Sequence, residues 1–211
     1  EGGGDPEMNP TLRTMFQKAR DQSVPLDTIE KAIKRGAGQL EGVAYESITY
    51  EGYASGGVAL LVDVLTDNRN RSGSDVRSVF TKRGGSVAEP GAVAWQFDRK
   101  GTMLVDGSVA EDDLMLAAID AGAEDITREG DYWRVTTGPT DLHAVRTAVE
   151  EAGYKVEESD LTMVAQNLVT LDDKSAAKKV LDLVDALDDL DDVQAVHGNF
   201  DITDDVLAEL G

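Results

Sequence analysis

One order of secondary structure, strand-helix-strand-strand-helix-strand, occurs twice in the pattern of apolar residues, and this repetition constrains the fold most. The first copy has a strand at 102–105, a helix at 110–121, strands near 123–128 and 132–136, a helix from Pro139 to Gly153 and a strand-like stretch within 154–171. The second copy has strands at 58–65, 92–97, 167–171 and 193–201, with helices at 72–83 and 174–190. This split βαβ order is typical of ferredoxin-like domains.

The elements of the second copy lie on both sides of the first in the chain, so we expect one domain to be inserted in the other. Before both, apolar residues at helical spacing between 8 and 36 predict two short helices. The predicted fold class is therefore α+β, a small helical N-terminal domain followed by two ferredoxin-like α/β domains. We place the boundaries at 1–42 for the helical domain, 43–100 with 166–211 for the outer domain, and 101–165 for the inserted one.

Two local patterns predict specific structure. Asp27, followed by Glu30 three residues later, is typical of a helix N-cap, and we expect Asp27→Ala to cost about 1 kcal/mol. The stretch from Val58 to Leu65 is apolar at every position except Asp63. A strand of this kind indicates the centre of a sheet that is covered on both faces.

Composition excludes several classes of function. The chain has no cysteine, which excludes disulfides, a thiolate nucleophile and Cys-ligated metals. His143 and His197 are the only histidines, and neither has an evident partner for catalysis. The glycine pairs lack phosphate-loop spacing, and the acidic run 185–192 lacks the spacing of a calcium loop. We therefore expect that the protein is not an enzyme and binds no cofactor or metal. No apolar run approaches the roughly 20 residues that cross a bilayer, so we expect no membrane segment. The absence of cysteine fits a cytoplasmic protein, which is the location we expect.

Charge is distributed unevenly along the chain. Residues 1–100 contain 13 basic and 14 acidic side chains, whereas residues 101–211 contain 7 and 27. Such an acidic second half repels nucleic acid and anionic membranes. Solubility or adaptation to salt also explains this acidity. Any contact with a polyanion is therefore expected in the first half.

Two basic clusters in the first half are candidate nucleic-acid contacts. The main one consists of Arg69, Arg71, Arg77, Lys82 and Arg83, with the amides of Asn68 and Asn70. Guanidinium groups suit phosphate oxygens, and the loop precedes a helix whose N-terminus favours an anion. The alternative is that this loop pairs with the acidic half of the same molecule. No aromatic residue alternates with this cluster, so base stacking is not predicted here.

The second basic cluster is Lys31, Lys34 and Arg35, at the end of the second predicted helix. These three residues are candidates for a further nucleic-acid patch. Basic residues in the last turn of a helix also stabilise its dipole, and that alternative stays open.

Several segments resemble the YebC/PmpR family, whose mitochondrial relatives are described as translational activators of cytochrome c oxidase. The segments are Gly2–Pro6 with Asn9–Leu12, Val24-Pro25 with Ile29–Gly36, Tyr50–Tyr53 with Gly57–Ala59, Leu65–Arg71, Gly84–Ser86 and Pro90–Phe97. The run Thr66-Asp67-Asn68-Arg69-Asn70-Arg71 is the most specific of them. The resemblance implies three domains, a helical one and two of the α/β type. It also implies a strongly basic segment before the glycine-rich start, which this sequence lacks, so we expect weak binding.

The resemblance implies a DNA-binding transcriptional regulator or, alternatively, a ribosome-associated translation factor that acts at proline-rich stretches. A third hypothesis is a small-molecule sensor or protein-interaction module built from two ferredoxin-like domains. The expected partners are DNA, ribosomal RNA or both, with no membrane and no small-molecule substrate. The sequence does not determine the oligomeric state, and we expect a monomer.

Overall fold

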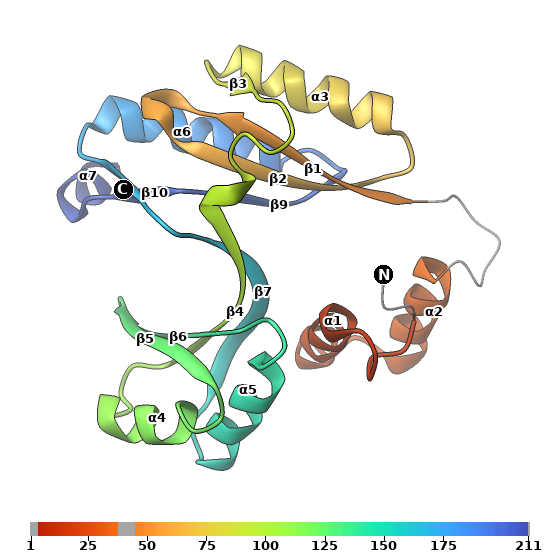
Figure 1. Cartoon of the computed structure of the whole chain (residues 1–211), viewed down its shortest axis with the longest axis vertical. Helices are drawn as coiled ribbons and strands as arrows, with labels where there is room; N and C mark the ends of the chain where they lie inside the picture. Colours follow the sequence, from red (N-terminus) through yellow and green to blue (C-terminus); the bar gives the residue numbers. More distant parts are fainter. Residues whose placement is uncertain (1–3, 38–44, 211) are drawn as a thin grey trace. The chain divides into compact units, whose positions relative to one another are not determined.

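The computed structural model describes residues 4–37 and 45–210 (Figure 1). Contacts group the chain into two compact units: unit 1 combines Glu1–Gly42 with Arg99–Thr162, and unit 2 combines Val43–Asp98 with Met163–Gly211. The α+β fold class is confirmed. The three-domain boundaries stay a prediction, and the one at residue 42 lies outside the described residues.

Unit 1 begins with helices α1 (Pro10–Asp21) and α2 (Leu26–Gly36). Asn9 caps α1, because its side-chain oxygen accepts a hydrogen bond from the Leu12 N–H at 3.1 Å. The predicted cap at Asp27 is wrong. Pro25 is the N-cap of α2 and supplies no side-chain hydrogen bond, so Asp27 already lies in the first turn, where its carboxylate pairs with Lys31 at 3.5 Å. Its charge there favours the helix dipole without capping a backbone group.

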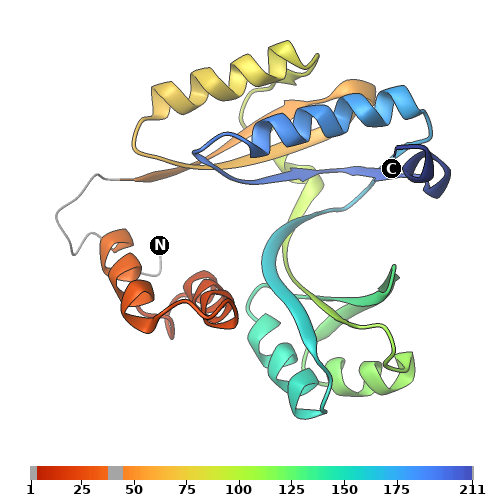
Figure 2. The same cartoon turned by 180° about the vertical axis from the view of Figure 1, so that it is seen from behind.

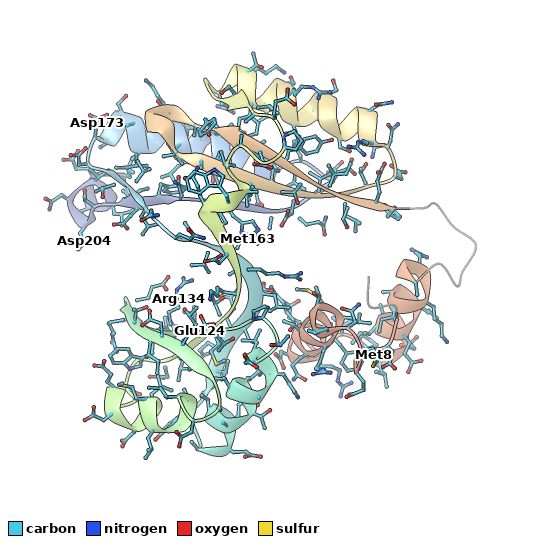
Figure 3. All side chains as sticks on the ribbon, viewed as in Figure 1. Met8, Glu124, Arg134, Met163, Asp173 and Asp204 are labelled. Atoms are coloured by element: carbon cyan, nitrogen blue, oxygen red, sulfur yellow. The ribbon has the colours of Figure 1, made fainter. Side chains whose placement is uncertain are left out.

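The inserted α/β part contains β4 (Phe97–Asp106), α4 (Glu111–Ala118), β5 (Ala123–Glu129), β6 (Tyr132–Thr137), α5 (Leu142–Glu151) and β7 (Val156–Ala165). Its sheet has the order β5-β6-β4-β7. The core contains Met103, Val105 and Val135 from the sheet and Leu114 and Val145 from the helices. Charged side chains cover much of its surface, among them those of Glu124 and Arg134, which bind Lys100 and Glu129 (Figure 3).

Unit 2 contains β1 (Glu46–Tyr53), β2 (Ala59–Thr66), α3 (Arg69–Lys82), β3 (Ser86–Val87), β8 (Val169–Leu171), α6 (Lys174–Asp188), β9 (Val193–Gly198), β10 (Phe200–Ile202) and α7 (Asp204–Leu210). The main sheet has the order β3-β1-β2-β9, so strands from both ends of this unit pair directly. Figure 2 shows α3 and α6 packed on one face of this sheet. Leu60 and Val62 of β2 pack there against Val76, Phe80 and Leu183 of the helices.

The prediction that β2 is covered on both faces is confirmed for the first half of the strand, whereas Leu65, near its end, is 39% exposed. Ala59 and Leu61 point away from the helices and are buried against Val93 and Phe97. Val93 lies in the segment between β3 and β4, and Phe97 is the first residue of β4; this part of the chain crosses the sheet on the face opposite α6 (Figures 1 and 2). Burial on both faces explains why β2 is almost continuously apolar.

Two predicted strands of the main sheet are absent from it. Segment 92–97 is a turn followed by a short 3-10 helix at Ala94–Gln96, because the N–H groups of Val93 and Ala94 bind the carboxylate of Glu51. The strand β8, predicted as part of 167–171, pairs instead with β10 in a separate two-stranded parallel sheet. The main sheet contains β1 and β3 instead of these two predicted strands: β1 pairs with β2, and β3 pairs with β1.

Other boundaries shift by a few residues. Helix α5 begins at Leu142 rather than at Pro139, and the strand predicted at 193–201 is divided into β9 and β10. Over residues 4–37 and 45–210, no helix combines the length and the apolar character that crossing a membrane requires.

Candidate nucleic-acid interface

The loop from Thr66 to Arg71 forms the start of α3. Asn68 is the N-cap, and its side-chain oxygen accepts from the Arg71 N–H at 3.1 Å. The Asn68 N–H donates to the hydroxyl of Thr66 at 2.9 Å. The Asn68 amide, a candidate nucleic-acid contact, therefore already uses its oxygen to cap the helix. Asn70 is exposed in the first turn.

Arg71 is held inside unit 2 by two carboxylates. Its guanidinium lies 2.9 Å from an oxygen of Asp67 and 2.8 Å from one of Asp192. Asp192 also accepts from the Ser72 hydroxyl at 2.6 Å and bonds to the Thr66 hydroxyl at 3.0 Å. The hydrogen bonds from Ser72 and Arg71 lower the pKa of Asp192, and the bond to Asp192 raises the pKa of Arg71. A phosphate must therefore compete with two carboxylates for Arg71.

The other cations of α3 are more available. Arg69 is 68% exposed and lies 3.8 Å from Glu46. Arg77, Lys82 and Arg83 are exposed and form no ion pair with any residue in the described part of the chain. Successive helix residues are separated by about 100° around the axis. Arg77 therefore lies roughly 120–140° around the axis from Arg71 and Lys82. The cations of the cluster are thus spread around α3 and do not form one stripe along it.

The second predicted patch lies on α2, in unit 1. Lys31, Lys34 and Arg35 are all exposed. Lys31 interacts with Asp27 at 3.5 Å, one helical turn away. Lys34 and Arg35 occupy the last turn of α2, where they also complement the helix dipole. These residues thus belong to a different compact unit from those of α3.

A cleft of about 520 Å³ in unit 2 lies beside Arg71 and Ser72. Its walls come from α3 and from the turn between α6 and β9, and they carry four carboxylates: Asp75, Asp189, Asp191 and Asp192. Within the described residues, no group of three or more carboxylate, histidine or cysteine side chains is arranged to hold a metal ion. The acidic walls disfavour phosphate in this cleft.

Comparison with known proteins identifies the family. A model described as the TACO1/YebC protein N-terminal domain matches residues 1–39, and one described as the TACO1/YebC second and third domain matches residues 45–200. The chain belongs to the TACO1/YebC family. Two relatives named "Probable transcriptional regulatory protein", from Halothermothrix orenii and Rubrobacter xylanophilus, are 52% and 53% identical to it; each comparison covers 100% of this chain and 84% of the relative.

A solved structure supports the same assignment. The crystal structure of a conserved hypothetical protein from Aquifex aeolicus is 44% identical in sequence, with a TM-score of 0.84 over 96% of this chain and 84% of that chain. The TACO1/YebC fold thus accounts for nearly the whole chain, and the names of its relatives make this a family of regulators.

The TACO1/YebC chain also contains an aromatic pair that sequence reasoning did not connect with the basic cluster. The Tyr53 hydroxyl and the Trp95 indole N–H both donate to the carbonyl oxygen of Ala92, at 3.3 and 3.1 Å. The only sequence signal was a tryptophan shortly after the Pro90-Gly91 turn and among small residues. Tyr53 comes from β1, 42 residues earlier, so the pair exists only in the folded chain.

Proposed function

We propose that the protein is a nucleic-acid-binding regulator of gene expression that contacts DNA through α3. One observation carries this proposal. Arg77, Lys82 and Arg83 are exposed and form no ion pair with a described residue, although the chain has twice as many acidic as basic side chains and a net charge of −21. Where carboxylates are so abundant, three cations left without one are available for an external anion.

The expected contact is electrostatic and largely independent of base sequence. Lysine and arginine bind phosphate oxygens and release counterions from the DNA, which makes affinity steeply dependent on salt. The acidic remainder of the chain opposes binding. We therefore expect weak affinity, with Asn70, Arg69 and the α2 residues Lys31, Lys34 and Arg35 as proposed secondary contacts. Arg71 and Asn68 have a mainly structural role in this proposal, because both bind within unit 2.

Binding of labelled duplex DNA, measured by fluorescence anisotropy over a range of salt concentrations, tests the proposal. The test variant is Arg77→Ala/Lys82→Ala/Arg83→Ala. The matched control is Lys174→Ala/Lys178→Ala/Lys179→Ala, which removes the same charge from exposed positions on α6. We expect the test variant to bind more weakly and its salt slope to fall by roughly 0.9 per lost contact, or about 3 in total.

The outcomes separate the candidate targets. Equal effects of the two variants would contradict a specific role of α3. Co-sedimentation with ribosomes, measured in parallel at the same salt, distinguishes DNA from ribosomal RNA. If the α3 variant loses only the ribosome signal, the target is ribosomal and the proposed DNA role is wrong.

A further inference from the structure

Two aromatic rings are exposed beside each other on unit 2. Trp95 is 67% exposed and Tyr53 is 36% exposed. Their polar atoms donate to the same oxygen, the carbonyl of Ala92, so neither ring needs a further hydrogen-bond partner. What they offer to the surroundings is therefore their apolar faces. Together the two rings offer a ligand an exposed aromatic surface.

The segment that carries Trp95 is held in place by a buried carboxylate. The buried carboxylate of Glu51 accepts hydrogen bonds from the N–H groups of Gly91, Val93 and Ala94, at 2.5, 2.7 and 2.8 Å. Val93 is itself fully buried against β2. Because the backbone on both sides of Ala92 is held, the carbonyl oxygen that accepts from both rings has a defined position. A ligand thus meets a preorganised surface and pays little to order it.

Two of the free cations, at the end of α3, lie at the same end of β1 as the aromatic pair, with α3 on one face of the sheet and the segment of Trp95 on the other. Tyr53 is paired with Ser86 across the β1–β3 ladder. Ser86 follows Lys82 and Arg83 after only two glycines. The backbones approach closely here, since a Cβ on Gly85 would lie 2.8 Å from the carbonyl oxygen of Tyr53.

We propose that Tyr53 and Trp95 form a stacking platform for unpaired bases of single-stranded nucleic acid, and that Lys82 and Arg83 neutralise its phosphates. This inference rests on the proposed function and specifies its ligand. A strand that passes around this end of the sheet would stack its bases on the rings and present its phosphates to the cations, the combination that binds single strands, because every base has a face that stacks. In a duplex those faces are covered by neighbouring bases. Aromatic pairs also bind proline-rich peptides, but such a ligand leaves the cations at this end of the sheet without a role.

Intrinsic fluorescence provides a direct test, because the chain has only two tryptophans, Trp95 and Trp133. Oligothymidylate and oligouridylate serve as single-stranded DNA and RNA probes, and a duplex of equal length serves as the reference. We expect both single strands to quench the wild-type emission. In Trp95→Phe the quenching should disappear while binding is retained, since phenylalanine also stacks. In Trp133→Phe both quenching and binding should be retained.

Affinity measurements complete the test. Trp95→Ala and Tyr53→Ala should each weaken single-strand binding by roughly tenfold or more and leave duplex binding unchanged. Tyr132→Ala, which removes a ring of similar exposure from unit 1, is the matched control and should change neither. Stronger binding of oligouridylate than oligothymidylate would identify RNA as the source of the bases, and the reverse would identify DNA.

Two kinds of failure are distinguishable. If single strands bind through Lys82 and Arg83 but Trp95→Ala binds them as tightly as wild type, the platform is wrong and the proposed function stands. Wild-type protein that binds neither single strands nor duplex would remove both proposals. A third result would identify a different ligand. If the protein binds a polyproline peptide but no single strands, and Trp95→Ala abolishes peptide binding, the platform binds peptides and the proposed nucleic-acid ligand is wrong.

Discussion

Glu51 offers the sharpest test of how unit 2 holds its surface loop. Both of its carboxylate oxygens accept hydrogen bonds from the loop: Oε1 accepts from the N–H of Gly91, and Oε2 accepts from the N–H groups of Val93 and Ala94. In Glu51→Gln, one of these oxygens becomes an NH₂ group, which faces a backbone N–H and cannot accept from it. At least one hydrogen bond to a charged acceptor is lost, which costs about 2 kcal/mol of unfolding free energy at neutral pH.

The effect must also depend on pH in a defined direction. Burial tends to raise the pKa of Glu51, but the three N–H donors together outweigh it, so the pKa lies below the ordinary value of 4.5. A carboxyl whose pKa is lowered by folding stabilises the protein above its unfolded-state pKa, and this contribution is lost as the pH falls through the folded-state value. The difference between wild type and Glu51→Gln should therefore be largest near neutral pH and shrink below about pH 4.5.

Urea unfolding, followed by the emission of Trp95 in a Trp133→Phe background, measures this difference within unit 2. Glu89→Gln is the control, because Glu89 is an exposed carboxylate on the same loop and should change stability by less than about 0.5 kcal/mol. A Glu51→Gln variant as stable as wild type at neutral pH would refute the reasoning. So would a loss of stability that stays constant as the pH falls.

Three further changes test other parts of the structure. Thermal melting should show that Asn9→Ala costs about 1 kcal/mol through loss of a helix cap, whereas Asp27→Ala costs less than about 0.5 kcal/mol; the reverse order would restore the cap at Asp27. Gly52→Ala should lower the unfolding free energy by about 2 kcal/mol or more in urea, because the new Cβ would lie 2.5 Å from the phenylalanine ring of α3; an unchanged midpoint would contradict this packing. Asp192→Asn should release Arg71 and tighten duplex binding in the anisotropy assay, while unfolding at neutral pH becomes easier and the penalty fades below about pH 3.8, since the pKa of Asp192 is lowered. Unchanged affinity would show that Arg71 does not limit binding.

The elements that the sequence predicted best are those whose pattern is set by burial. Strand β2 is apolar on both faces because a helix layer covers one face and the segment before β4 covers the other. The secondary structure of the inserted part was also predictable, since the amphipathic helices α4 and α5 alternate with the strands of its single sheet. In such elements, residues near in sequence carry the whole signal.

The errors arise where a distant residue decides the local structure. Segment 92–97 has the composition of a strand, but a carboxylate some 40 residues earlier takes the N–H groups that a sheet would need. Asp27 has the sequence context of a cap, but Pro25 occupies the N-cap position and the helix begins at Leu26. For the candidate site, the residue types of the basic cluster were visible in the sequence, yet which cations remain available was not.

Arg71 shows why that last distinction requires the fold. It belongs to the most specific run of the family resemblance, but its guanidinium binds Asp192, which is 121 positions away in the chain. That contact, with the cap at Asn68, secures the beginning of α3 to the turn before β9. The free cations Lys82 and Arg83 lie at the opposite end of the helix, next to the strand that pairs with Tyr53. One end of α3 is therefore used to hold unit 2 together, and the proposed contacts with nucleic acid lie further along the helix and at its other end.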